Sequence, residues 1–183
     1  MNSMRGQFLV ASPHLPDKNF FQSVVLIIQH TEEGAVGFIL NRPTAKTVRE
    51  VWTLFSDGSC DCDAQINDGG PVDGPLMAVH MSTFLSEEEI IPGVHLATQK
   101  DNIHRLVTHS NKPFRVFSGY AGWGPGQLDE ELEAGGWLIA AAESTDVFSE
   151  PDKMWKRVSQ NIGREILLAS VPERLIPDDP SVN

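Results

Sequence analysis

Residues 23–40 read SVVLIIQHTEEGAVGFIL, and this stretch indicates the fold class of the chain. Ser23–His30 is rich in valine and isoleucine, which is typical of a buried strand. Thr31–Gly34 carries a turn signal and Ala35–Leu40 continues as a second apolar strand, so together they predict a β-hairpin. Because both strands are nearly continuous apolar runs, we expect a sheet that is covered on both faces.

Further strands are expected on either side of this hairpin. They are short apolar runs bounded by proline, glycine, asparagine or serine residues. These segments are Gln7–Ser12, Pro75–Met81, Val94–Ala97, Phe114–Ser118 and Trp137–Ala142.

Four other segments carry the capping residues or the apolar spacing of helices. Thr47–Glu50 matches a capping box ahead of a short helix, and a second helix is expected to begin within Thr98–Asp101. A third is expected over Gln127–Ala134, and a fourth begins at Pro151 and stops at Gly163. Because hairpins and helices are interspersed rather than strictly alternating, the order favours an α+β fold with a mixed or antiparallel sheet and several short flanking helices.

The composition is that of a globular protein, with 183 residues of which 40% are hydrophobic. We expect residues 1–176 to form a single domain and residues 177–183 to form a disordered tail. The apolar run Val24–Ile28 is too short to cross a bilayer, so no membrane partner is expected. Cys60 and Cys62 do not have the pattern of a secreted disulfide framework, and we expect a cytoplasmic protein.

The charge of the chain limits its partners. The formal net charge is −11 and the isoelectric point is about 4.8. Nucleic-acid binders neutralise phosphates with lysine and arginine, and no basic recognition helix is visible, which argues against direct nucleic-acid binding. A small molecule or another protein remains as the partner class.

The glycine-rich stretch Gly119–Leu128, with the sequence GYAGWGPGQL, is the most unusual segment of the chain. Between a strand and a helix such a loop could bind phosphate, but Asp129–Glu131 in the first helical turn would repel an anion. The structural alternative is that the glycines let Trp123 pack against the sheet in a tight turn. A third alternative is a neutral or cationic ligand that stacks on Tyr120 or Trp123.

A candidate ligand-binding cleft combines this stretch with two other motifs. Arg42, at a strand end beside Asn41, is able to hold a carboxylate or phosphate. Its alternative role is an ion pair or hydrogen bonds with loop carbonyls. If the turn containing Gly70 lies nearby, then Asn41, Arg42, Gly70, Tyr120, Trp123 and Gln127 line one cleft.

Other chemistry finds little support in the sequence. The six histidines form no metal-spaced pair, so no metal site is expected, and the cofactor is unknown. His80 lies in a strand pattern and is expected to be a hydrogen-bonded core residue. The acidic runs Glu87–Glu89 and Asp129–Glu131 are expected to be solvated faces. No serine has a recognisable elbow or a histidine partner, so no catalytic residue is identified.

Three separated blocks resemble the AlgH/YqgE family of uncharacterised bacterial proteins. The first block runs from Gly6 to Pro43, the second is Gly69–Val72, and the third is Gly119–Leu128 with Trp137 beyond it. Order and spacing agree along roughly residues 4–168. The resemblance implies a compact α+β fold in which a bent sheet closes into a pseudo-barrel. It also implies a regulatory role, since family members have been described as transcriptional regulators, without an established activity.

Three functional hypotheses follow. The leading one is a non-enzymatic protein that regulates by binding a small molecule or a protein. The second is an enzyme of unknown reaction with a site around Asn41, Arg42 and the Gly119–Gln127 loop. The third is a structural or interaction protein without a ligand, in which the motif residues only maintain the fold.

Overall fold

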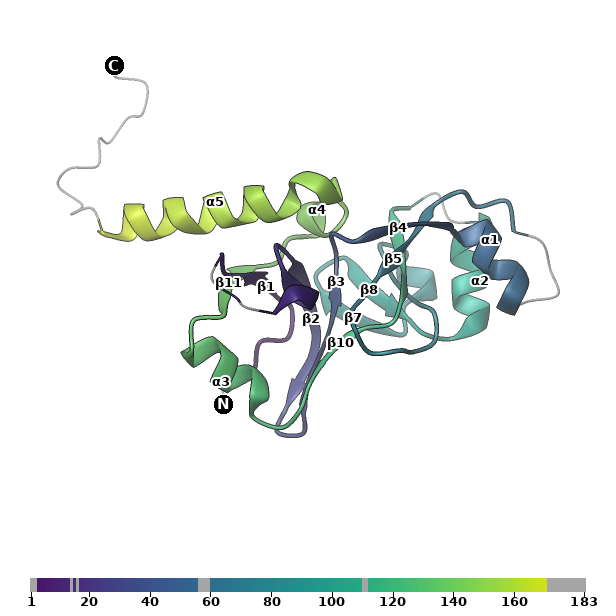
Figure 1. Ribbon diagram of the computed structural model, residues 1–183. Coiled ribbons are helices and arrows are strands. Elements are labelled where there is room, and N and C mark those ends of the chain that lie inside the picture. The colour runs from purple at the N-terminus through teal and green to yellow at the C-terminus, as the bar shows by residue number, and fades with distance from the viewer. Residues whose placement is uncertain (1–2, 14, 16, 56–59, 110–111, 171–183) are drawn as a thin grey trace, which may run out of the picture.

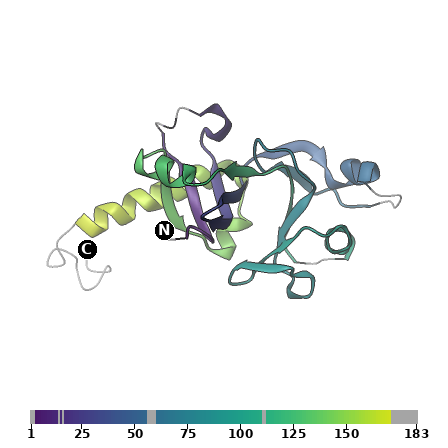
Figure 2. The ribbon, with the colours of Figure 1, turned by 90° about the horizontal axis from the view of Figure 1, so that it is seen from below.

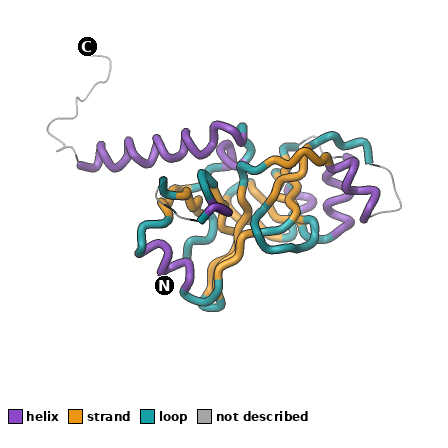
Figure 3. The backbone as a smooth tube through the Cα atoms, in the orientation of Figure 1, coloured by secondary structure: helices purple, strands orange, loops and turns teal. Residues whose placement is uncertain are grey.

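The computed structural model describes residues 3–13, 15, 17–55, 60–109 and 112–170. Its strands form two sheets that lie side by side, with helices on their outer sides (Figures 1, 2 and 3). The expected tail at residues 177–183 lies outside the described residues. No helix in the described part of the chain has the length and apolar character needed to cross a bilayer.

The first sheet, sheet A, is antiparallel throughout and has the strand order β10-β3-β2-β1-β11. The predicted hairpin forms its centre as β2 and β3, and its long apolar runs are buried as expected. The strands of sheet A are β1 (Gln7–Ala11), β2 (Val24–Thr31), β3 (Gly34–Ile39), β10 (Ala121–Trp123) and β11 (Trp137–Ala141).

The second sheet, sheet B, has the order β4-β5-β9-β6-β8-β7, and only its β5–β9 pair is parallel. Several of its strands are short and polar, which is why the sequence pattern did not reveal β4, β5 and β7. The strands of sheet B are β4 (Pro43–Thr47), β5 (Gln65–Asp68), β6 (Met77–His80), β7 (Glu88–Ile91), β8 (Val94–Ala97) and β9 (Phe114–Ser118).

The helices cover the outer sides of the sheets. Helices α1 and α2 lie beside sheet B, and α5 runs along sheet A and projects beyond it (Figure 1). The helical elements are η1 (Lys18–Phe20), α1 (Val48–Phe55), η2 (Thr83–Leu85), α2 (Lys100–His109), α3 (Gln127–Glu133), α4 (Ser144–Val147) and α5 (Pro151–Ser170).

The predicted α+β class with a mixed sheet arrangement and short flanking helices is confirmed. The pseudo-barrel is not: in the described part of the chain the strands form two open sheets, each with two edge strands. The sheets share a core instead. The rings of Phe38 from sheet A and Phe117 from sheet B stack with their centroids 4.6 Å apart. One cluster of buried side chains contains residues of both sheets.

Two helix predictions have different outcomes. The capping box at α1 is confirmed, since the Thr47 N–H donates to Glu50 Oε2 (2.8 Å) and the Glu50 N–H donates to Thr47 Oγ1 (3.3 Å). The predicted stop at Gly163 is wrong, because α5 continues to Ser170. A glycine ends a helix when it adopts the left-handed conformation, and Gly163 is not among the glycines with positive φ.

The two sheets are joined where the Gly69–Gly70 turn meets the start of the glycine-rich stretch, a region that we call the glycine seam. The Gly69 N–H donates to the Ser118 carbonyl (3.0 Å), and the Gly69 carbonyl accepts from the Ile39 N–H (2.9 Å). Gly69 therefore connects β9 of sheet B with β3 of sheet A. A short bridge between Val72 and Tyr120 continues this contact.

The seam leaves no room for side chains. A Cβ atom on Gly69 would lie 2.2 Å from the Gly119 carbonyl oxygen, and one on Gly70 would lie 2.3 Å from the Ala121 nitrogen. Gly70 and Gly119 also have φ of 148° and 74°, which favour glycine. Gly70 was predicted to line a ligand cleft, and the structure shows that close backbone packing requires glycine at Gly69, Gly70 and Gly119.

The position of Glu87 differs from the prediction that the acidic run Glu87–Glu89 is a solvated face. It was expected to lie on a solvated face, but its carboxylate accepts hydrogen bonds from the Thr98 N–H (2.8 Å), the Gln99 N–H (2.9 Å) and Asn102 Nδ2 (2.8 Å). Burial opposes the charged form, yet these hydrogen bonds prevail and lower the pKa of Glu87. Glu87 thus satisfies the N–H groups of the two residues that lead into α2.

His80 is a hydrogen-bonded core residue, as predicted. Its side chain is fully buried, and Nδ1 accepts a hydrogen bond from the Ser82 N–H (3.2 Å). Burial, followed by the neighbouring ring of His95 at 5.8 Å, lowers the pKa of His80 from 6.5 to about 4. His80 is therefore neutral in the folded protein at physiological pH.

The glycine seam predicts opposite effects for two alanine substitutions. Gly69→Ala should lower the free energy of unfolding by at least about 1–3 kcal/mol, because its Cβ collides with the Gly119 backbone. Gly163→Ala, in an open part of α5, should raise it by roughly 0.5–1 kcal/mol. Urea unfolding measures both free energies. Equal stability of the Gly69→Ala variant and the wild type would refute the close backbone packing at the glycine seam.

His80 predicts a loss of stability in mild acid. Its folded pKa of about 4 lies below the ordinary 6.5, so its contribution is complete above pH 6.5 and is lost as the pH falls toward 4. Between about pH 7.5 and about pH 5 the loss should be on the order of 2 kcal/mol. His80→Asn should remove this part of the pH dependence in urea unfolding. An unchanged pH dependence in the variant would show that His80 does not cause it.

Candidate functional site

Arg115 is the most unusual charged residue of the core region. It lies on β9 among apolar residues, and its guanidinium reaches across the junction of the two sheets. Nε donates to the Val147 carbonyl (2.8 Å), Nη1 to the Leu40 carbonyl (3.2 Å), and Nη2 to the Ser149 carbonyl. Arg115 thereby connects sheet B with the end of β3 and with the segment between α4 and α5.

The charge of Arg115 is not balanced by a carboxylate. Among the described residues no aspartate or glutamate forms an ion pair with it, and only carbonyl dipoles approach the guanidinium. Burial lowers the pKa of Arg115, but the group remains protonated because a free guanidinium titrates far above neutral pH. A partly buried cation without a counter-ion is an electrostatic site for an anion.

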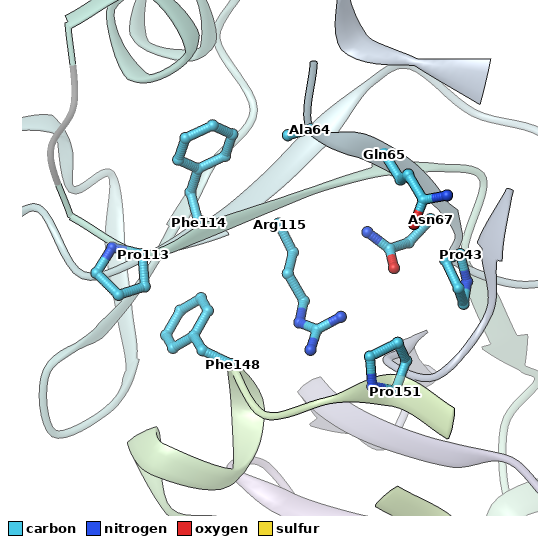
Figure 4. Close-up of a pocket in the computed structure, with 9 residues that line it drawn as sticks. All are labelled: Pro43, Ala64, Gln65, Asn67, Pro113, Phe114, Arg115, Phe148 and Pro151. Atoms are coloured by element: carbon cyan, nitrogen blue, oxygen red, sulfur yellow. The ribbon is translucent and has the colours of Figure 1, made fainter. Parts of the chain in front are cut away.

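A cavity of about 250 Å³ lies around this guanidinium. Figure 4 shows the guanidinium near its middle, between the rings of Phe114 and Phe148 on one side and the amides of Gln65 and Asn67 on the other. The remaining lining residues are apolar, namely Pro43, Ala64, Pro113 and Pro151. The cavity combines one cation and two amides with apolar proline, alanine and phenylalanine side chains.

Asn67 adds an acceptor to this cavity. The residue is 4% exposed, and its Nδ2 donates to the Val116 carbonyl (3.2 Å). Its Oδ1 is buried and has no hydrogen-bond partner among the described residues. An acceptor left in this way loses its hydration without compensation, so a donor supplied by a ligand would stabilise the site.

The structure places the predicted residues Asn41 and Arg42 outside this cavity. Asn41 Oδ1 accepts from the Val24 N–H (2.9 Å), and Nδ2 donates to the Gln22 carbonyl (2.8 Å). Arg42 Nη2 donates to the Phe21 carbonyl (3.2 Å). Both side chains therefore hold the turn before β2, where Gln22 has a φ of 53°. This matches the alternative in which Arg42 binds loop carbonyls.

Gly70 and Tyr120 meet at the glycine seam. Gly70 lines another cavity, of about 510 Å³, together with Lys46, Asp68 and Ser118. Neither Asn41 nor Arg42 is among the residues that line it, so the structure does not bring the whole predicted set together in one described pocket.

Trp123 and Gln127 belong to a separate network around Glu131. Glu131 Oε2 accepts from the indole N–H of Trp123 (3.0 Å) and from that of Trp137 (2.8 Å), and Oε1 accepts from Gln127 Nε2 (2.9 Å). Trp123 is 5% exposed, in agreement with the packing alternative for the glycine-rich stretch. Glu131 itself was expected on a solvated face; it is only partly exposed, and its carboxylate accepts from the two buried indoles.

Sequence reasoning missed Arg115, Asn67 and Gln65 as a site. A signal was available in one case: Arg115 interrupts the apolar strand pattern of Phe114–Ser118, where a charged side chain requires compensation. Asn67 and Gln65 carried no signal, because β5 has no apolar alternation and forms only by pairing with β4 and β9.

Comparisons with known proteins agree on one family. The family model described as AlgH-like matches residues 8–167. A UPF0301 protein of Streptomyces avermitilis is 34% identical over 203 residues, covering 100% of this chain and 97% of that protein. A UPF0301 protein of Chlorobium luteolum is 38% identical over 176 residues, covering 92% and 91%.

Solved structures agree with the fold. The solution structure of the AlgH protein from Pseudomonas aeruginosa has a TM-score of 0.72 at 27% identity, and covers 94% of this chain and 97% of that one. The crystal structure of a Corynebacterium diphtheriae protein has a TM-score of 0.69 at 25% identity, with 88% of each chain covered.

Proposed function

The chain belongs to the AlgH-like family, and we propose that it binds a small organic anion at Arg115 and acts in regulation through this binding. One observation carries the proposal: a partly buried guanidinium without a carboxylate partner lines a cavity beside the unsatisfied Oδ1 of Asn67. An anionic ligand would balance the charge, and a donor on the same ligand would satisfy the amide oxygen.

The dimensions and walls of the cavity define the ligand class. A volume of about 250 Å³ admits only a small molecule. The proline and phenylalanine walls favour an apolar body, while Arg115 favours a carboxylate or phosphate end. We therefore expect a small hydroxy or amino acid, or a similarly small phosphate ester, with its anionic group at the guanidinium and its donor at Asn67.

The regulatory part of the proposal rests on the position of Arg115. The same guanidinium that would bind the anion also holds the carbonyls of Leu40, Val147 and Ser149. A ligand that takes up N–H groups of the guanidinium changes how firmly the start of α5 is held against sheet B. Binding of the anion then shifts the equilibrium between conformations that differ in the position of α5. A partner protein that binds one of these conformations better than the other responds to the shift.

The sequence-based site at Asn41, Arg42, Gly70, Tyr120, Trp123 and Gln127 stays a prediction, as do the enzyme and ligand-free alternatives and the cytoplasmic location. A role as a transcriptional regulator is compatible with this proposal if the protein does not contact DNA itself. The net charge of −11 argues against direct DNA contact, so such a role would pass through a partner protein.

Ligand binding can be tested by a thermal-shift screen of small carboxylates and phosphates, followed by calorimetry on any compound that raises the melting temperature. Arg115→Met should weaken binding by about thirtyfold or more, because hydrogen bonds to a charged donor are lost. Arg42→Ala is the matched control, since the Arg42 side chain donates to the Phe21 carbonyl outside the cavity, and its removal should leave the affinity unchanged.

A second variant keeps the test decisive if Arg115→Met does not fold. Asn67→Leu keeps the shape of the side chain and removes the acceptor in the cavity, so it should weaken the same ligand while preserving Arg115. Equal affinity of wild type, Arg115→Met and Asn67→Leu would exclude this cavity. Loss of binding in Arg42→Ala alone would move the site to the predicted cleft instead.

A further inference from the structure

A cavity of about 330 Å³ lies between η1 and the C-terminal end of α3. It is separate from the Arg115 cavity, because no described residue lines both. The charged residues that line it in the described part of the chain are Asp17 and Glu131, and both are acidic. The lining residues are Leu15, Asp17, Phe20, Glu131 and residues 134–136.

The carboxylate of Glu131 accepts hydrogen bonds from neutral donors. These donors are the indole N–H groups of Trp123 and Trp137 and the side-chain amide of Gln127. Among the described residues no lysine, arginine or histidine forms an ion pair with Glu131. Neutral donors orient a carboxylate but leave its charge in place, so a cation that enters the cavity gains a charge-assisted contact with this partly exposed group.

Asp17 adds a second negative charge to the cavity. Its Oδ1 accepts from the Asn19 N–H (2.7 Å), which caps η1. Like Glu131, it forms no ion pair with a basic residue that the structure describes. The two carboxylates come from segments far apart in the sequence, and a cation in the cavity reduces the repulsion between them.

The ring of Phe20 supplies an aromatic wall. Phe20 is 8% exposed, and its ring stacks on Trp123 (centroids 5.8 Å apart) and meets Trp137 edge to face (5.2 Å). This packing holds the ring in place at the cavity, and an aromatic ring attracts an ammonium group through its quadrupole. Trp123, one of the residues on which a ligand was considered from the sequence, does not line the cavity.

We infer that this cavity binds a small organic ammonium ion. Its charged group lies at the carboxylates of Glu131 and Asp17, and its alkyl groups contact Phe20 and Leu15. The volume is that of a small-molecule site. The apolar walls favour an organic cation over a metal ion, because Ca²⁺ and Mg²⁺ require six or more oxygen ligands. The negative net charge of −11 attracts cations to the surface and acts in the same direction.

Titration with choline and with benzylamine, followed by ¹H–¹⁵N NMR, tests the inference. The indole N–H groups of Trp123 and Trp137 both donate to Glu131, so at least one of the two ammonium compounds should shift their resonances in a saturable way. The uncharged analogues 3,3-dimethylbutan-1-ol and benzyl alcohol have nearly the same shapes. Each analogue should bind at least about tenfold more weakly than its ammonium counterpart, because it lacks the charge.

Substitutions that remove charge without removing a hydrogen-bond acceptor locate the site. Glu131→Gln keeps an oxygen for the two indoles and should weaken ammonium binding by about tenfold or more. Glu133→Gln makes the same change at an exposed position of α3 that does not line the cavity, and it is the matched control that should leave the affinity unchanged. Asp17→Asn keeps the cap of η1 and should weaken binding by about threefold or more, which keeps the test decisive if Glu131→Gln does not fold.

Three results overturn the inference. The first is that neither choline nor benzylamine shifts the two indole resonances in a saturable way. The second is that the uncharged analogues bind as tightly as the ammonium compounds. The third is that wild type, Glu131→Gln and Asp17→Asn bind the same compound with equal affinity.

Discussion

The close approach of two backbones at the glycine seam determines how the two sheets are placed. Gly69 bridges β9 and β3 at distances that exclude a Cβ atom, and Gly70 and Gly119 allow the chain to turn there. Because β9 is fixed against β3 at this point, Phe117 stacks on Phe38 and one core serves both sheets. A glycine turn that looks like a ligand loop in the sequence is thus the connection on which the packing of the molecule depends.

Arg115 owes its position to the same connection. It lies on β9 three residues before Ser118, whose carbonyl accepts from Gly69 at the seam, and it points across the junction to the Leu40 carbonyl just after β3. No carboxylate of the described residues neutralises the Arg115 guanidinium, so the junction of the two sheets carries an unbalanced positive charge beside a cavity. The strand that the glycine seam fixes against sheet A thus also carries the charge that lines the cavity, which links the fold to the proposed binding function.

The predictions that succeeded depend on local interactions. The hairpin at residues 23–40, the capping box at Thr47 and the buried His80 follow from periodicity or from neighbours a few residues apart. Most of the predictions that failed depend on partners that the local pattern does not contain: Glu87 accepts from the Thr98 N–H eleven residues away, and β5 forms only between β4 and β9. Glu131 accepts from two indoles that lie six and eight residues away in the sequence. The Arg115 cavity belongs to the second kind, because residues from β4, β5, β9 and the α4–α5 segment line it, and only the folded chain brings these elements together.

The most direct test of this account observes the Arg115 guanidinium itself. Its Nε–H is held by the Val147 carbonyl at 2.8 Å, so it should give a distinct side-chain resonance in a ¹H–¹⁵N NMR spectrum, assigned by its absence in Arg115→Lys. Titration with small carboxylates and phosphates should shift this resonance in a saturable way with at least one class of compound. A resonance that does not respond to any of them, while the protein remains folded, would contradict the proposal that this charge is a ligand site.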